Sequence, residues 1–221
     1  MQKLNSFKRR AALAGAVFSA AAALIPSVLR AQSANPVRRK RTPTEIEGPF
    51  YPLGFPADSD NDLTQIGGAA TQAIGERLQI NGRVLLEDGR AVTGARVEIW
   101  QVDHAGSYIH PAGASAAAPR DAGFQGFGAT LTDVDGRYQF TTIKPPPYET
   151  RPAHIHFKVK RAGSADFTTQ MFFEGANKES GFVGLFYRPL DRWAAERPLL
   201  TVRITPGLNG APLVAVFDIV L

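Results

Sequence analysis

The chain has 221 residues, of which 44% are apolar and 20% are charged, and its pI is about 9.7. This length and apolar content suit one folded domain with one sizeable hydrophobic core. The absence of cysteine excludes disulfide bonds, thiolate metal ligands and a thiol nucleophile. Five of the 25 basic residues and no acidic residue lie before a cut after Ala31. The remainder therefore carries 20 charges of each sign, and the basic pI predicts no nucleic-acid partner.

The first 31 residues have the features of an export signal. A basic start is followed by an Ala-rich apolar run over residues 11–29 and then by small residues. The pair Arg9 and Arg10 before this weakly apolar run resembles a twin-arginine signal, the kind that exports folded proteins. Because alanine is weakly apolar and Pro26 disrupts a helix, an uncleaved membrane anchor is the less favoured alternative. We expect an exported protein, periplasmic or extracellular, without a stable membrane span after signal removal.

The rest of the chain alternates between short strands and loops. We expect residues 32–43 to form a flexible, basic leader and residues 44–221 to form the folded domain. Alternating apolar and polar residues predict strands at 78–86, 92–103, 137–143, 153–159, 167–173, 199–204 and 213–221. Only residues 188–195 predict a short helical turn. The pattern indicates an all-β fold, an antiparallel β-sandwich or barrel with little helix.

Turns and one long loop connect these strands. The turn at Glu87–Arg90, with a positive φ at Gly89, predicts a hairpin between the first two strands. A second tight turn is expected at residues 133–136. Residues 104–128 are rich in glycine and alanine and show no period, which in a compact domain is typical of a functional loop. Tyr108 lies in this loop.

A candidate metal site lies in the stretch PPPYETRPAHIHF at residues 145–157. His154 and His156 are two residues apart in a strand, so their side chains share one face. Tyr108 and Tyr148 stand on flanking loops and can add oxygen ligands, and a set of imidazole and phenolate suits a hard, highly charged cation such as Fe(III). Buried tyrosines are common and a His pair on a strand is as often structural, so the residues alone leave both interpretations open.

Several stretches together resemble the intradiol ring-cleavage dioxygenases, especially the protocatechuate 3,4-dioxygenase branch. They are, in chain order, TEIEGPFY, GRVLLEDGRAVTGARVEIWQVDHAGSY, GFQGFGATLTDVDGRYQFTTIKPPPY, RPAHIHFKV and TTQMFF. The resemblance covers roughly residues 44–174, and the HIH strand preceded by a turn tyrosine is its most specific part. It implies a β-sandwich with the iron lodged between its sheets.

The resemblance also assigns roles to the four candidate ligands. Tyr108, Tyr148, His154 and His156 match the protein ligands of a non-haem Fe(III) in the family. By the same match, Tyr148 is the axial tyrosine that leaves when substrate binds, and Tyr108 is the one that stays. The implied reaction uses O2 to cleave a catechol-type substrate between its hydroxyl-bearing carbons, to a cis,cis-muconate-type diacid.

Three further residues match the family's substrate pocket. Arg151 resembles the arginine that stabilises negative charge on the substrate ring, and Gln170 resembles the pocket glutamine on the next strand. Pro49 belongs to a segment that approaches the active site. The alternative for Arg151 is a surface ion pair with Glu149 or Glu174. We interpret Tyr138 as a core residue and His104 and His110 as surface residues.

A non-catalytic binding module is the alternative function, because the same turns occur in transthyretin-like and carboxypeptidase-regulatory-like sandwiches. The set of two tyrosines and two histidines separates the two hypotheses, since a binding module has no reason to keep it. By the resemblance, we expect no helical N-terminal domain of the kind found in catechol 1,2-dioxygenases, and the link PYETRPAH is shorter than in protocatechuate enzymes. The physiological catechol is therefore left open, and so is a homo-oligomer.

Overall fold

The computed structural model describes residues 38–114, 118–148, 151–175 and 197–221. The expected export signal and the expected helical turn at 188–195 lie outside these ranges, as do the first residues of the leader. In the described ranges, no helix combines the length and hydropathy needed to cross a membrane. The helices present there are three 3-10 turns, at Pro111–Gly113, Arg197–Leu199 and Leu208–Gly210.

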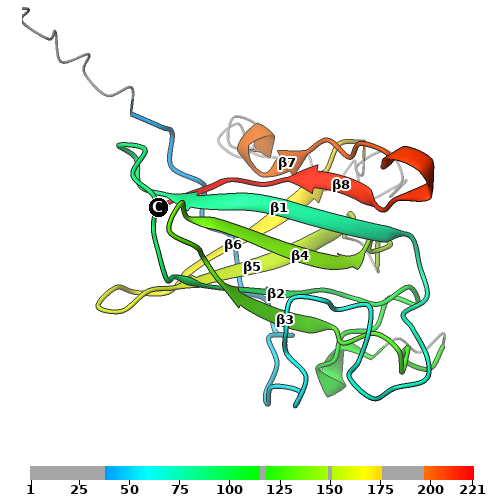
Figure 1. Cartoon of the computed structure of the whole chain (residues 1–221). Coiled ribbons are helices and arrows are strands. Elements are labelled where there is room, and N and C mark those ends of the chain that lie inside the picture. The colour runs from blue at the N-terminus through cyan, green and yellow to red at the C-terminus, as the bar shows by residue number, and fades with distance from the viewer. Residues whose placement is uncertain (1–37, 115–117, 149–150, 176–196) are drawn as a thin grey trace, which may run out of the picture. The chain divides into compact units, whose positions relative to one another are not determined.

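The described strands form two β-sheets (Figure 1). The first sheet has the order β4-β1-β8, with β9 also beside β1, and contains β1 (Arg77–Leu85), β4 (Arg137–Ile143), β8 (Leu213–Val216) and β9 (Ile219–Val220). The second has the order β3-β2-β5-β6-β7 and contains β2 (Arg96–Trp100), β3 (Phe127–Leu131), β5 (His154–Lys160), β6 (Phe167–Phe173) and β7 (Thr201–Val202). β8 and β9 pair with β1 in parallel, as β7 does with β6, and the remaining pairs are antiparallel. The predicted all-β sandwich is confirmed, and the barrel alternative is excluded because neither sheet closes.

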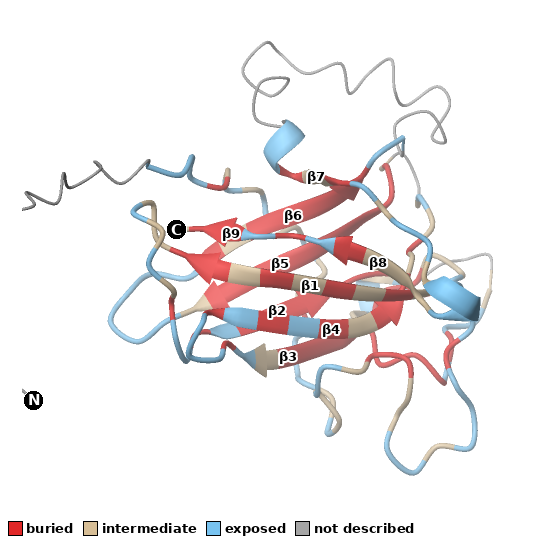
Figure 2. Ribbon diagram, turned by 45° about the horizontal axis from the view of Figure 1, so that its top comes forward, coloured by how far each residue is buried: buried red, intermediate tan, exposed pale blue. Residues whose placement is uncertain are grey.

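Alternation along the strands builds the core between the sheets. In β4, Tyr138 and Phe140 are buried while Arg137 and Gln139 are exposed, and Figure 2 shows this alternation in colour. Burial of one large apolar side chain contributes roughly 1.5–3 kcal/mol. Core members that are fully buried come from both sheets and include Leu78, Ile80, Ile99, Phe140 and Phe157. Tyr138 also belongs to this core, as predicted.

The predicted hairpin between the first two strands is wrong, although the turn itself forms. Leu86 donates its N–H to the Arg90 carbonyl at 2.8 Å, and Gly89 has a φ of +86° as expected. However, β1 lies in the first sheet, whereas β2 pairs with β3 and β5 in the second. A further turn at Gly94, with a φ of +69°, separates the two strands. Alternation predicts which face of a strand is buried, but it does not predict the neighbouring strand.

Strand boundaries also differ from the predictions. β3 begins at Phe127, inside the region expected to be loop, and the turn at residues 133–136 leads from β3 in one sheet to β4 in the other. The expected final strand is split into β8 and β9, because Asp218 between them turns its carboxylate to the Arg83 N–H at 2.9 Å.

An N-terminal arm, residues 42–56, begins beside β9 of the first sheet and continues onto the second sheet. Thr42, which the sequence placed in the leader, is 5% exposed and exchanges hydrogen bonds of 2.9 Å with the Val220 backbone. Further along, Glu45 donates its N–H to the Thr168 carbonyl on β6 at 3.0 Å. The arm thereby crosses strands of the second sheet on the way to the loop that carries Tyr108.

Candidate functional site

The four residues proposed as metal ligands lie together. The Tyr108 Oη atom is 3.2 Å from Tyr148 Oη and 3.1 Å from His156 Nε2. His156 Nε2 is in turn 3.2 Å from His154 Nε2. Residues separated by up to 48 positions in sequence thus place two phenol oxygens and two imidazole nitrogens at one point.

Strand β5 sets the direction of the two histidines. Ile155 and Phe157 point into the core between the sheets, so His154 and His156 point to the other face of the second sheet. Trp100 lies opposite His156 on β2, and its ring stacks on the imidazole with centroids 4.7 Å apart and planes 13° apart. The candidate ligands on β5 therefore do not lie between the sheets, where the resemblance had implied the iron, because the apolar residues of β5 occupy that interior.

Burial keeps both imidazoles neutral, which is the form that binds metals. Burial and the nearby Arg151 charge lower the pKa of His154 to about 3. Burial, together with His154 and Arg151, lowers the pKa of His156 well below its usual value. The Nδ1–H of His154 donates to the Pro152 carbonyl at 2.7 Å, so its Nε2 presents a lone pair to the cluster.

The spacing of the four atoms fits one bound cation. Two ligands at about 2.1 Å from an ion, at angles between 90° and tetrahedral, lie about 3.0–3.4 Å apart. The three separations in this cluster are 3.1–3.2 Å. Within the described part of the chain, no group of three or more His, Cys, Asp or Glu residues can hold a metal. A set of two imidazoles and two phenols therefore makes this cluster the candidate metal centre of the described residues, and it suits a hard cation of high charge.

The two tyrosines differ in how firmly they are held. Tyr108 is 2% exposed, its N–H donates to the Gly113 carbonyl at 2.8 Å, and its ring packs on Phe50 with centroids 4.9 Å apart. Tyr148 is only partly buried and meets Tyr108 edge to face. The second phenol can therefore move away more easily than the first.

The arginine predicted to line the pocket is held beside the cluster. Arg151 Nη2 donates to the Gln170 side chain at 2.8 Å, and Gln170 Nε2 donates to the Ile46 carbonyl of the N-terminal arm at 2.8 Å. The Arg151 Nε atom is buried and has no hydrogen-bond partner among the described residues. Glu174 pairs instead with Arg203 at 2.9 Å, which contradicts the alternative ion pair with Arg151. Glu149 lies outside the described residues.

The N-terminal arm passes close to the candidate ligands. Gly48 has a φ of +73°, and a Cβ at that position would lie 3.7 Å from His156 Cε1. Pro49 follows it and is exposed, while Phe50 packs on Tyr108. Gly48 and Phe50 therefore bring the arm beside the candidate ligands, and the assignment of Pro49 to a substrate pocket stays a prediction.

Sequence reasoning placed the two remaining histidines at the surface. His104 is exposed, and its Nδ1 lies 3.6 Å from an Asp121 carboxylate oxygen. His110 is partly buried and accepts the Ala112 N–H at 3.1 Å. Trp100, by contrast, was not identified as a site residue. Its contact with His156 depends on the register of β2 against β5, which the hydrophobic pattern does not contain.

Comparison with known proteins indicates a family for the chain. A family model described as a dioxygenase matches residues 46–180. The protocatechuate 3,4-dioxygenase beta chain of Burkholderia cepacia is 42% identical over 125 residues, which is 52% of this chain and 52% of that protein. Catechol 1,2-dioxygenase 2 of Acinetobacter lwoffii is 32% identical over 152 residues, covering 61% of this chain and 52% of that protein.

A solved structure supports the same relationship. The dioxygenase domain of a dioxygenase and carbohydrate-binding protein fusion from Streptomyces sp. SirexAA-E matches with a TM-score of 0.60 and 25% identity. The match covers 82% of this chain and 98% of that domain. This chain spans about half the length of the curated relatives that it matches. The family model covers more than half of the chain, and the chain therefore belongs to the intradiol ring-cleavage dioxygenase family.

Proposed function

We propose that this protein is a non-haem Fe(III) intradiol dioxygenase of the protocatechuate or catechol class. It uses O2 to cleave a catechol between the two hydroxyl-bearing carbons and forms a cis,cis-muconate-type diacid. The observation that carries the proposal is the chain of contacts from Tyr148 through Tyr108 and His156 to His154, whose successive donor atoms are 3.2, 3.1 and 3.2 Å apart. These four side chains hold the iron in the proposed enzyme.

Each phenol has its own part in the proposed reaction. When bound, ferric iron would act as a Lewis acid that favours loss of the two catechol hydroxyl protons, and the resulting dianion has a ring that is electron-rich toward O2. Tyr148, which is only partly buried, leaves its position and accepts one substrate hydroxyl proton at its Oη atom, and a hydroxide ion takes the other proton. Tyr108, enclosed by Phe50 and Gly113, keeps its place.

Arg151 serves as the electrostatic partner of the substrate ring. Its guanidinium is fixed by Gln170, which is fixed by the Ile46 carbonyl, so the positive charge is oriented before substrate binds. A preorganised charge in a site shielded from water stabilises negative charge that develops during a reaction. Pro49 and the rest of the N-terminal arm limit the space beside the ring and exclude water.

The proposed location is outside the cytoplasm. The basic and apolar pattern of the first 31 residues supports export by a twin-arginine route, so that iron is inserted before export. Replacing Arg9 and Arg10 by Lys is expected to retain the precursor in the cytoplasm, as measured by cell fractionation and immunoblotting. Export of the double variant at the wild-type level would refute this route.

Spectroscopy on the iron-loaded protein tests the proposed function. Phenolate-to-Fe(III) charge transfer is expected to colour the protein, and oxygen uptake against a panel of protocatechuate, catechol and hydroxyquinol is expected to identify the substrate class. Tyr148→Phe is expected to change the visible band. The proposal is refuted if the iron-replete protein is colourless, consumes no oxygen with any catechol and keeps the same spectrum in Tyr148→Phe. A non-catalytic binding module would then be the remaining hypothesis.

A further inference from the structure

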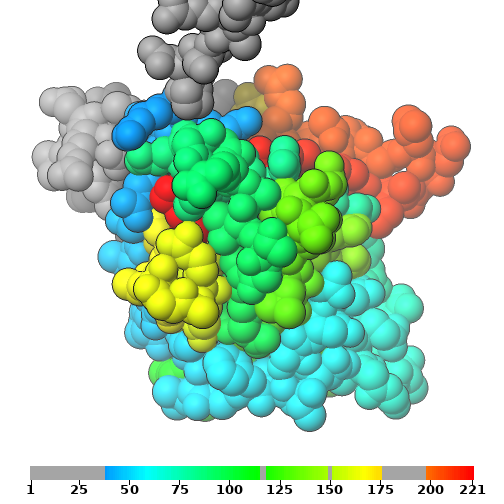
Figure 3. Space-filling view, turned by 60° about the vertical axis from the view of Figure 1, so that its left-hand side comes forward, coloured from blue at the N-terminus to red at the C-terminus, as the bar shows by residue number. Residues whose placement is uncertain are grey.

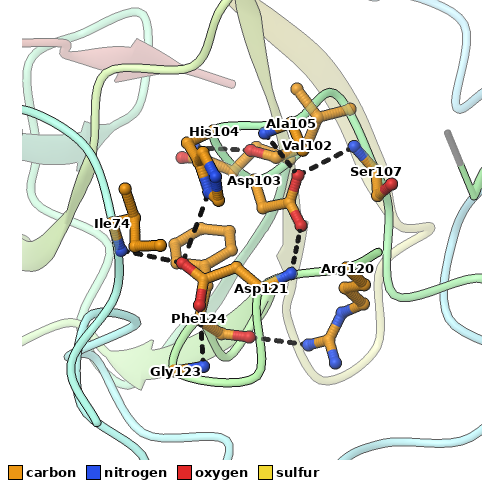
Figure 4. A network of polar contacts seen from close by, with 11 residues as sticks. Ile74, Val102, Asp103, His104, Ala105, Ser107, Arg120, Asp121, Gly123 and Phe124 are labelled. Carbon is orange, nitrogen blue, oxygen red and sulfur yellow. Dashed lines mark hydrogen bonds and ion pairs between the residues drawn. The ribbon is translucent and has the colours of Figure 1, made fainter. Parts of the chain in front are cut away.

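Two buried carboxylates organise the loop that carries Tyr108 (Figure 4). Asp103 is fully buried and Asp121 is 8% exposed. One oxygen of Asp103, Oδ1, accepts the N–H groups of Ala105 and Ser107, both at 2.9 Å. The other oxygen, Oδ2, accepts the Asp121 N–H at 2.7 Å. Both oxygens of Asp103 are thus bonded to backbone amides of the same loop.

Asp121 extends this network to a distant segment. Its Oδ2 atom accepts the Ile74 N–H at 2.7 Å, and its Oδ1 atom accepts the Gly123 N–H at 2.8 Å. Figure 4 shows Asp121 between Ile74 and the Asp103 turn. The two ends of the long loop and the segment at residue 74 are therefore joined through two side chains.

The network has the chemistry of a structural anchor and not of a cation site. Each of its four carboxylate oxygens accepts at least one of five backbone N–H groups, so all four oxygens are engaged with the backbone. Amide donors also offset the cost of burying a carboxylate, since hydrogen bonds to a charged acceptor are about twice as strong as neutral ones. Removal of the carboxylate would leave buried amides without an acceptor.

The Asp103 turn contacts both tyrosines of the candidate metal centre. Ser107, which donates to the Asp103 carboxylate, also accepts the Asp103 N–H through its carbonyl at 2.9 Å, and the next residue is Tyr108. Gly106 occupies the turn with a φ of +82°, and a Cβ there would lie 3.6 Å from the Tyr148 Cβ. The turn therefore fixes the backbone of one tyrosine and packs against the side chain of the other.

We propose that Asp103 is a positioning residue for Tyr108 and Tyr148, and that Asp121 holds it in register with the rest of the fold. Asp103 acts through the backbone, by holding the Tyr108 phenol 3.1 Å from His156 Nε2. This inference rests on the proposed function of the cluster as an iron centre. It adds that the geometry of the phenolates depends on a carboxylate that does not belong to the cluster.

The variant Asp103→Asn tests this role with little change in volume. Asparagine keeps one oxygen for Ala105 and Ser107 but directs an NH2 group at the Asp121 N–H, so the loop loses one bond and gains an unfavourable contact. Mutation of a residue that orients a metal ligand typically lowers metal affinity by about 10–100-fold. We expect ferric iron to bind Asp103→Asn about tenfold or more weakly, with a shifted phenolate charge-transfer band and a lower kcat at similar KM.

Asp133→Asn is the matched control, because Asp133 forms the same kind of turn away from the site. Its Oδ1 atom accepts the N–H groups of Asp135 and Arg137 at 2.9 and 2.8 Å. This variant is expected to keep wild-type iron affinity and spectrum. Thermal unfolding of both iron-free variants measures any loss of stability. A loss of stability alone leaves the charge-transfer band of the iron-loaded variant unchanged, whereas a loss of positioning shifts it.

Asp121→Asn is the second variant, because it disturbs the anchor one step further from Tyr108. It is expected to shift the band in the same direction as Asp103→Asn, by a smaller amount. Wild-type iron affinity and an unchanged band in Asp103→Asn overturn the positioning role, while the coloured wild-type protein leaves the proposed function intact. Failure of both variants to fold also overturns it, because the carboxylates would then serve folding alone. A colourless, inactive wild-type protein refutes the proposed function itself.

Discussion

Two turns at opposite ends of the second sheet share one sequence pattern and one set of hydrogen bonds. Both read Asp-x-x-Gly-x, and in both the Asp Oδ1 atom accepts the N–H groups two and four residues further on. Gly106 and Gly136 have φ values of +82° and +74°, a conformation that favours glycine. The first turn starts at Asp103 after β2, and the second starts at Asp133 after β3.

The two turns differ in what surrounds them. Asp103 is fully buried, its second oxygen is bonded to Asp121, and its turn leads to Tyr108. Asp133 is exposed, and the Val134 carbonyl of its turn accepts a hydrogen bond from the Thr93 hydroxyl at 3.2 Å, at the side of the molecule that Figure 3 brings forward. The local sequence therefore specifies the turn, whereas burial and the second oxygen decide whether the turn supports a reactive group.

The largest expected difference between the two ends comes from removing a candidate ligand. His156→Ala deletes one of the four candidate ligands. We expect ferric iron affinity and oxygen uptake to fall by more than the roughly 10–100-fold that is typical when a residue orienting a metal ligand is mutated. Tyr138→Phe, a buried change near the Asp133 turn, is expected to lose one hydrogen bond to Phe217 and to keep iron binding. Iron titration followed by visible absorbance measures both. Full colour and activity in His156→Ala would place the metal elsewhere.

The next largest effect separates the two aspartates by stability. Asp103→Ala leaves three amides of a buried loop without an acceptor, and we expect a loss of about 3 kcal/mol or more in the free energy of unfolding. Asp133→Ala is expected to lose about 1 kcal/mol or less, because water replaces the carboxylate at an exposed turn. Urea denaturation of the iron-free proteins measures both values. Equal losses would show that the turn alone, and not its burial, accounts for the stability.

The same pair of turns shows how far the sequence predicts this fold and site. Alternation located most strands, and the spacing of His154 and His156 predicted their common face. Three features depend on how the strands associate in the sheets. They are the partner strand of β1, the position of the site on the outer face of the second sheet, and the stacking of Trp100 on His156. Asp103 could not be distinguished from Asp133, because their local sequences obey the same rule and differ only in tertiary burial.

Two arginines extend the comparison to the reaction itself. Arg151 is held by Gln170 beside the cluster. Arg151→Gln is expected to lower kcat by about 100-fold, because removal of one preorganised charge-stabilising group typically lowers kcat by about this factor. Arg137, in the exposed turn, pairs with Asp135 and is expected to leave kcat unchanged when changed to Gln. Steady-state oxygen uptake with the preferred catechol measures both variants. An unchanged kcat in Arg151→Gln would remove this residue from the proposed reaction.

The smallest expected effect concerns a third buried carboxylate, whose partners are side chains instead of backbone amides. Glu98 on β2 is 1% exposed and bonds to Arg96, Tyr51 and Lys160. Burial raises the pKa of Glu98, but the hydrogen bonds from these three side chains outweigh it and leave the pKa below its usual value. The folded protein therefore binds fewer protons at Glu98 than the unfolded chain does as the pH falls toward that usual value.

It follows that the stability contributed by Glu98 is complete above about pH 4.5 and is lost as the pH falls through the lowered pKa. Glu98→Gln is expected to flatten the acid limb of the stability curve by about 1 kcal/mol or less, because its partners Arg96 and Lys160 are partly exposed and water can solvate them without the carboxylate. Urea denaturation of the iron-free protein at pH 7 and pH 4 measures this change. Glu87→Gln, at an exposed ion pair with Arg38, serves as the control and should leave the limb unaltered. A steeper acid limb in Glu98→Gln would mean that burial, and not its three partners, governs this carboxylate.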